Sequence, residues 1–214
     1  MKVVIQKTDL DTCLTALIMG VTGSDKVIIS KGDAPEEDSK NPDVLCIEAG
    51  GSGQTQWNNF DHHNEGSGLH PACLQAYMAA GKDDAKLKRL VDYVCIVDDR
   101  PKDHPNVKFP SLSNLFSGLL FVELNPVAQL FKGMEMLRMV LQDDIDPFDT
   151  MPDMEEWKEY KRAKKENMKK VEETLKKAKF HTAASGMKIG YLESDFIGGI
   201  GTLYGGGMRF CDNV

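Results

Sequence analysis

Two aspartates separated by one residue follow the first apolar run of the chain. Lys2 to Gln6 (KVVIQ) has the composition of a strand, and Asp9 and Asp11 come soon after it. Two acids at i and i+2 beyond a strand end can turn toward one crevice, where a cation or a proton must offset their repulsion. The alternative is structural, because Asp11 or Thr12 could cap the helix that follows. The pair alone leaves both interpretations open.

A second polar group is Asp61-His62-His63, which follows an aromatic residue and lies near glycines. Neighbouring histidines offer imidazole nitrogens to a transition metal or to an ion such as Mn²⁺ or Mg²⁺. An adjacent carboxylate can orient one of the rings from behind. A single histidine is more often structural, whereas three such residues in one run favour a site.

A third group ends the apolar helical pattern of Leu90 to Val97 and consists of Asp98, Asp99 and Arg100. An acid that emerges from a buried helix is difficult to explain by solvation alone. Arg100 could bind a phosphate oxygen or could simply pair with Asp99 at the surface. The sequence leaves both roles for the arginine open.

The elements that must position these groups are typical of a parallel α/β fold. Strands that are apolar on both faces and separated by helices predict a parallel sheet with covered faces. In such sheets ligands bind beyond the carboxyl ends of the strands, which is where the polar motifs fall. The predicted strands are Lys2–Gln6, Lys26–Ser30 and Val44–Glu48, and the predicted helices are Cys13–Val21, Leu69–Ala80 and Ala85–Val97.

The second half of the chain predicts a boundary, a linker and a further piece. Pro126 fits the first turn of a new helix, and the prolines and aspartates of residues 144–153 interrupt the helical pattern. We predict a main domain over residues 1–150, a long charged linker helix over 151–182, and a partial second α/β domain over 183–214. The last of these would open with a strand at Met187–Leu192.

Composition excludes several classes of protein. A formal net charge of −7 argues against general affinity for long nucleic acid or for an anionic membrane, although it leaves room for a local phosphate pocket. Five cysteines without regular spacing indicate reduced, buried thiols. No signal peptide and no apolar run of membrane-spanning length are recognisable, so we expect a cytoplasmic protein.

Taken together, the polar groups resemble the motifs of the DHH phosphoesterase superfamily. Asp9 and Asp11 form an Asp-x-Asp pair after the first strand, Glu48 is an acid that ends a later strand, Asp61-His62-His63 follows, and Asp98 comes farther along. The superfamily includes single-strand exonucleases, nano-RNases, cyclic-dinucleotide phosphodiesterases and family II inorganic pyrophosphatases. The resemblance spans about residues 1 to 100, motif by motif. It implies that residues 1–150 form a Rossmann-like, DHH-type catalytic domain.

The resemblance also implies a two-metal centre. Asp9 would bind one ion, whereas Asp11, His62 and Asp98 would bind the other and Glu48 would bridge the two. Oxygen ligands combined with imidazole favour Mn²⁺ or Mg²⁺. A water held between the cations would lose a proton more easily than bulk water and would attack phosphorus in line.

Roles in catalysis and substrate binding follow from the same resemblance. His62, His63 and Asp11 would be the catalytic residues, with Asp61 supporting the histidines. His63 would lie at the substrate phosphate or behind the metal ligands, and Arg100 is a second candidate for binding the substrate. The expected partner is a small phosphorylated molecule, with no membrane and no long nucleic acid, and a homodimer is compatible with the sequence.

Three positions depart from the family pattern. Glu48 stands where an aspartate is usual, so the bridging carboxylate is one methylene longer. Ile5 stands where some relatives have a histidine, which leaves the first metal site one ligand poorer and predicts weak occupancy. The glycine-rich loop of the usual second domain ends in a histidine, but here Gly205–Gly207 is followed by Met208.

We therefore expect a metal-dependent hydrolase, an exopolyphosphatase-related phosphoesterase acting on a small nucleotide, a short oligonucleotide or a short polyphosphate. The alternative is a degenerate DHH protein that binds nucleotide or phosphate without cleaving it, which Glu48, Ile5 and the short second domain favour. A third interpretation is a metal-free structural or interaction module. That interpretation requires Asp9, Asp11 and the other candidate ligands to be scattered in space.

Overall fold

The computed structural model describes residues 1–192 except 52, 64–67, 100–106 and 187. It divides the chain into two units, Met1–Lys161 and Arg162–Val214. The division falls inside a long helix, whereas the prolines and aspartates near residue 150 predict an earlier boundary. The three-part scheme of catalytic domain, linker helix and partial second domain stays a prediction.

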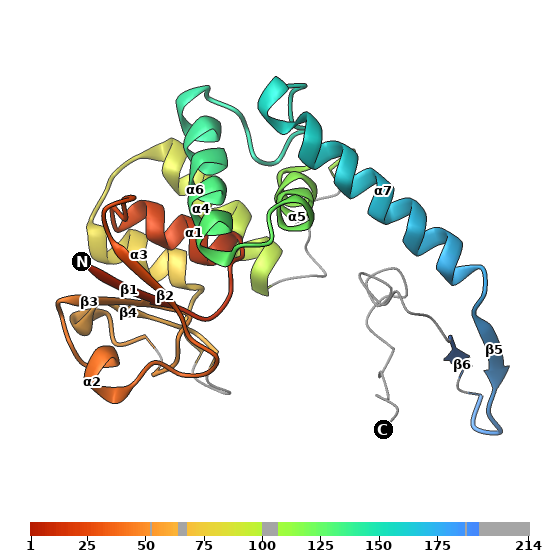
Figure 1. The fold of residues 1–214 in the computed structure, drawn as a ribbon, viewed down its shortest axis with the longest axis horizontal. Helices are drawn as coiled ribbons and strands as arrows, with labels where there is room; N and C mark the ends of the chain where they lie inside the picture. The colour runs from red at the N-terminus through yellow and green to blue at the C-terminus, as the bar shows by residue number, and fades with distance from the viewer. Residues whose placement is uncertain (52, 64–67, 100–106, 187, 193–214) are drawn as a thin grey trace. The chain divides into compact units, whose positions relative to one another are not determined.

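A four-stranded sheet organises the N-terminal part of the first unit (Figure 1). Its strand order is β2-β1-β3-β4, and every neighbouring pair is parallel. The predicted α/β class is therefore confirmed. The strands are β1 Lys2–Ile5, β2 Lys26–Ile29, β3 Val44–Ile47 and β4 Asn59–Phe60. The sequence pattern misses β4, because two residues are too few to show any period.

Both faces of the sheet are covered, as its apolar strands predict. Helices α1 and α3 lie on one side of the sheet in Figure 1, and α2 lies on the other. Alternate side chains of the central strands therefore enter different cores. The main core under α1 and α3 takes Val3, Ile5, Leu45 and Ile47, and a small cluster on the opposite face takes Val4, Val44, Cys46 and Ala49.

Helix α1 is central to the helical layer, because it packs against α3, α4 and α6. Helix α6 begins with Pro126 in its first turn, as predicted, and Asn125 caps it. The helices that begin in this unit are α1 Leu10–Ile18, α2 Glu36–Ser39, α3 Ala72–Ala80, α4 Ala85–Asp99, α5 Leu112–Val122, α6 Pro126–Gln142 and α7 Lys158–Leu175, with 3-10 turns η1 Thr55–Trp57 and η3 Glu155–Trp157.

Two helix starts differ from the sequence prediction. Helix α1 begins at Leu10 rather than Cys13, because Asp9 accepts a hydrogen bond at its N-terminus. Helix α3 begins at Ala72 rather than Leu69, because Pro71 keeps an extended backbone at the N-cap. Together the two helix starts place Asp11 inside one helix and opposite the start of the other.

The second unit contains the remainder of α7 and a two-stranded antiparallel sheet of β5 Lys179–Thr182 and β6 Lys188–Tyr191. The predicted strand at Met187–Leu192 corresponds to β6. However, β6 pairs with β5, a strand that the pattern did not predict and that occupies part of the expected linker helix. The glycine-rich run Gly198–Gly207 lies outside the described residues. Within the described part of the chain, no helix is both long enough and apolar enough to cross a membrane.

Gly133 on α6 lies against α1, and Gly133→Ala should destabilise the fold. An added Cβ would lie 2.5 Å from Cys13 Sγ and 2.8 Å from Phe116 Cε2. Overpacking costs roughly 1–3 kcal/mol, and the better helix propensity of alanine returns about 1 kcal/mol. We therefore expect a lower free energy of unfolding, measured by urea titration with circular dichroism. Gly23→Ala is the control, because its Cβ would meet no described atom within 4 Å. Equal stabilities of the two variants would contradict the close α1–α6 approach.

Candidate metal centre

The candidate residues meet where the sheet topology changes direction. From β1 the chain runs through α1 to β2 on one side, and it returns through α2 to β3 on the other side of β1. The loops that leave the carboxyl ends of β1 and β3 therefore diverge and open a crevice between them. The loop after β1 carries Lys7 and Asp9, and Glu48 directly follows β3.

Asp9 and Asp11 have different local roles. Asp9 is the N-cap of α1, and its Oδ1 accepts a hydrogen bond from the Thr12 N–H at 2.9 Å. The capping role therefore belongs to Asp9, and not to Asp11 or Thr12. Asp9 Oδ2 lies 3.0 Å from Lys7 Nζ. Burial lowers the pKa of Lys7, but the charge and hydrogen bond of Asp9 outweigh that effect and leave the pKa raised.

Asp11 is buried in the first turn of α1 and faces the start of α3. Its two carboxylate oxygens accept hydrogen bonds from the N–H groups of Ala72 at 2.8 Å and Cys73 at 2.7 Å. A carboxylate at a helix N-terminus is stabilised by the helix dipole. Burial nevertheless raises the pKa of Asp11 to about 8, and the charge of Glu48 adds to the shift. Asp11 thus joins α1 to α3 and also presents a carboxylate to the crevice.

Glu48 is held in an unusual backbone conformation. Its φ is 47°, in the left-handed region that non-glycine residues rarely adopt, at a cost of about 1–3 kcal/mol. Its N–H donates to the Phe60 carbonyl at 2.8 Å, so pairing with β4 fixes the position. The side chain is fully buried, and neither carboxylate oxygen accepts a hydrogen bond from any described residue. A buried carboxylate that accepts no hydrogen bond requires a cation nearby.

Asp61 shapes the loop that carries the histidines. Its Oδ2 accepts a hydrogen bond from the Gly50 N–H at 2.5 Å, and its Oδ1 accepts one from the His63 N–H at 2.8 Å. The Gln75 side-chain amide donates to the Asp61 carbonyl at 2.9 Å. The structure therefore gives Asp61 a supporting position next to His63, whose Nδ1 lies 3.2 Å from the same carboxylate.

His62 is the residue on which the carboxylates converge. Its Nε2 lies 3.0 Å from Glu48 Oε1, 3.1 Å from Asp98 Oδ2 and 4.0 Å from Asp11 Oδ2. Asp98 and Glu48 together raise the pKa of His62 to about 11. On the other side of the ring, Nδ1 lies 3.3 Å from Asp99 Oδ1. Sequence reasoning assigned Asp99 no role beyond pairing with Arg100, whereas here it can orient the imidazole of a metal ligand.

The positions of Asp98 and Asp99 are unfavourable without a cation. Both lie in the last turn of α4, where the helix dipole places partial negative charge. Carboxylates there are destabilised unless a positive charge lies close by. His62 supplies one when it is protonated, and a bound metal ion would supply a stronger one.

The described residues fit a divalent ion. Two groups of donor atoms, Glu48–His62–His63 and Asp11–His62–Asp98, each lie within 4.8 Å of one another. His62 Nε2 and both oxygens of Glu48 are buried and form ion-pair contacts, but no hydrogen bond of regular geometry, with the described residues, so an ion would complete their bonding. Carboxylate oxygens combined with imidazole nitrogens suit Mn²⁺ or Mg²⁺.

Five of the six residues that sequence analysis proposed for metal binding or catalysis come together, namely Asp11, Glu48, His62, His63 and Asp98. The sixth, Asp9, is engaged by Lys7 and the helix cap. Arg100, the second candidate for binding substrate, lies outside the described residues. Lys7 was not anticipated, although its place two residues after β1 is the signal that could have found it.

Two recesses border the centre. We call the first the glycine-loop recess, a polar cavity of about 350 Å³ lined by Gln6, Lys7, Asp33, Glu48, Gly50, Asp61 and His63. We call the second the α5 recess, a cavity of about 230 Å³ lined by Asp9, Leu10, Asp11, Val94, Val97, Asp98, Ser113, Phe116, Ser117 and Leu120. The α5 recess has mainly apolar walls, and candidate ligands line both cavities.

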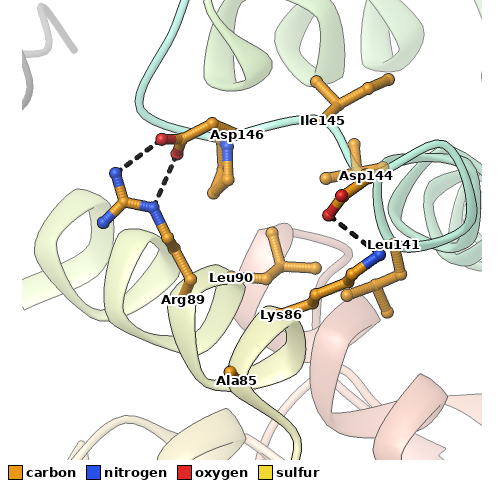
Figure 2. A pocket seen from close by; sticks show the side chains of 10 residues that line it. Ala85, Lys86, Arg89, Leu90, Leu141, Asp144, Ile145 and Asp146 are labelled. Carbon is orange, nitrogen blue, oxygen red and sulfur yellow. Dashed lines mark hydrogen bonds and ion pairs between the residues drawn. The ribbon is translucent and has the colours of Figure 1, made fainter.

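A third recess, of about 330 Å³, lies between α4 and the end of α6 (Figure 2). Its two cationic side chains are both neutralised. Arg89 forms a two-pronged pair with Asp146 at 2.9 and 2.6 Å, and Lys86 lies 2.9 Å from Asp144. Because these charges are already paired, we assign this recess no anionic ligand.

Scans against protein-family models and searches of curated proteins and of solved structures find no match to this chain. The resemblance to the DHH superfamily therefore depends on the motifs alone and stays a prediction.

Binding of Mn²⁺ should weaken as the pH is lowered from about 11, and more steeply below about 8. Asp11 and His62 must lose their protons to bind an ion, and their pKa values are raised to about 8 and about 11. Ion binding therefore releases protons, and protons compete more strongly at lower pH. Isothermal titration calorimetry at several pH values, in buffers of different ionisation enthalpy, measures both the affinity and the protons released. An affinity independent of pH would contradict the assignment of these ligands.

Proposed function

We propose that this protein is a divalent-metal-dependent phosphohydrolase that cleaves a small phosphoester or phosphoanhydride. The observation that carries the proposal is the buried pair of Glu48 and His62, whose facing atoms have no hydrogen-bond partner among the described residues. Carboxylates of Asp11 and Asp98 surround the same imidazole nitrogen. The order of these residues along the chain supports membership of the DHH superfamily.

Asp11, His62 and Asp98, with Glu48 beside them, would hold Mn²⁺ or Mg²⁺. When bound, the metal supplies a water of lowered pKa and neutralises charge that develops on the phosphoryl oxygens. Asp99 keeps the His62 ring oriented through Nδ1. Asp61 keeps the His63 backbone in place.

We assign substrate contact to His63 and Lys7. The His63 side chain is 52% exposed and lines the glycine-loop recess, with Nδ1 3.4 Å from Glu48 Oε1. It can bind a phosphoryl oxygen or hold a proton for the leaving group. The Lys7 ammonium lines the same recess and provides a positive charge for a phosphate.

The two recesses favour a phosphoester with an organic group over an inorganic polyphosphate. A phosphoryl group in the polar glycine-loop recess would be next to Glu48 and His63. The α5 recess begins at Asp11 and Asp98, and Leu10, Val97 and the other apolar side chains on its walls suit a nucleoside or another organic group. We therefore place nucleotides and short oligonucleotides ahead of polyphosphate as substrates.

A cytoplasmic location belongs to the same proposal. The four cysteines among the described residues are all free and buried. A reducing compartment keeps such thiols reduced.

Hydrolysis should require Mn²⁺ and should depend on His62 and Asp98. We expect His62→Ala and Asp98→Asn to lose more activity than the roughly 10–100-fold typical of residues that only support a ligand, and Asp99→Asn to fall within that range. Release of phosphate or nucleotide from a panel of nucleotides, dinucleotides and pyrophosphate is the measurement. Asp92→Asn is the matched control, since it changes a carboxylate on the same helix that pairs with Lys88 instead.

The activity test avoids substitution of Asp11. Asp11→Ala removes the acceptor for two N–H groups of α3 and would confound activity with stability. No turnover on any substrate of the panel by the Mn²⁺-loaded protein would contradict hydrolysis. Saturable nucleotide binding without product would then favour the degenerate binding protein.

A further inference from the structure

The ammonium of Lys7 lies between two acids that the motif pattern assigns to a second ion. Lys7 Nζ is 3.0 Å from Asp9 Oδ2 and 3.9 Å from Glu48 Oε2. Asp9 belongs to the loop after β1 and Glu48 to the end of β3. The lysine therefore bridges the two loops with a positive charge of its own.

On both acids the oxygen that faces the space between them is turned toward Lys7. Asp9 Oδ1 is the acceptor that caps α1, which leaves Oδ2, the atom that Lys7 contacts. The two carboxylate oxygens of Glu48 also face different groups. Its Oε1 faces His62 and His63, and its Oε2 faces Lys7.

The histidine does not provide a second ion position either. His62 belongs to both donor groups, and its Nε2 is the nitrogen that faces Glu48, Asp11 and Asp98. One nitrogen lone pair can bind only one ion. We therefore take the two donor groups to surround the same single ion, with Asp9 and Lys7 beside it.

We propose that the centre binds one divalent ion and that Lys7 takes the place of the second cation. This inference rests on the proposed function, because it concerns the same centre. The ammonium balances Asp9 and the outer oxygen of Glu48, and Lys7 lines the glycine-loop recess, where a phosphoryl group would bind. Lys7 therefore contacts the substrate directly, and its charge does not depend on the metal concentration.

The test is the number of Mn²⁺ ions bound by the full chain, measured by equilibrium dialysis with elemental analysis. We expect one ion per chain in the unaltered protein. Two ions would overturn the inference while leaving a metal-dependent hydrolase intact. No bound ion would instead remove the proposed function, so the two failures are distinguishable.

Lys7→Ala provides the second measurement. Removing the ammonium frees Asp9 Oδ2 and Glu48 Oε2, and one or two carboxylates with waters are sufficient for a weak Mn²⁺ site. We expect a second, weaker ion, with magnetic coupling between the two ions in electron paramagnetic resonance spectra. An unchanged count of one ion in Lys7→Ala would overturn the claim that the lysine occupies that position.

Lys31→Ala is the control, since Lys31 is an exposed lysine just after β2 and should leave the count at one. The Lys7 side chain is 55% exposed, so its loss should leave the fold intact, and a circular dichroism melt verifies this. Inorganic phosphate serves as a further probe. Its affinity for the Mn²⁺-loaded protein should fall in Lys7→Ala and stay unchanged in Lys31→Ala, and equal affinities would contradict a role of Lys7 at the phosphate.

Discussion

The burial of the Glu48 carboxylate beside other acids is the constraint on which this centre depends. Hydrogen bonds in this region hold the backbone: Asp61 accepts from Gly50, and Glu48 itself is positioned by its own N–H. The oxygens of Glu48 and the Nε2 of His62 receive none from the described residues. The surrounding structure thus fixes the backbone of Glu48 and leaves its carboxylate facing His62 and Lys7, an arrangement preorganised for positive charge.

Asp11 couples this centre to the stability of the fold. Its carboxylate closes the N-terminus of α3 and also faces His62. The helix N–H groups favour the charged form, whereas burial and the charge of Glu48 oppose it and prevail, because the pKa is raised. An ion would relieve that conflict. A ligand that binds only the folded state also stabilises it by mass action, so an ion bound by Asp11 would couple metal binding to folding.

The sequence was informative wherever a pattern repeats and uninformative wherever a contact depends on distant segments. The parallel sheet could be predicted from its apolar strands, whereas the convergence of Asp11, Glu48, His62 and Asp98 was expected only from the resemblance to the DHH motifs. Asp99 could not, since its role depends on which face of the α4 terminus meets the histidine loop. Strand β5 was missed because its four residues closely follow the charged run of α7 and are too few to show a clear period.

Lys7 is a second residue whose contacts the sequence could not reveal. With Lys7, the centre has two sources of positive charge that differ in their properties. A lysine beside Asp9 has the ordinary interpretation of a surface ion pair, and only the fold shows that Glu48 lies on its other side. A metal ion at His62 exchanges with solvent and competes with protons, whereas an ammonium carried by the chain does neither below its raised pKa. The positive charge of Lys7 beside Asp9 is therefore constant, whereas the positive charge at His62 depends on the metal concentration and on pH. The glycine-loop recess thus keeps the positive charge of Lys7 even when no ion is bound.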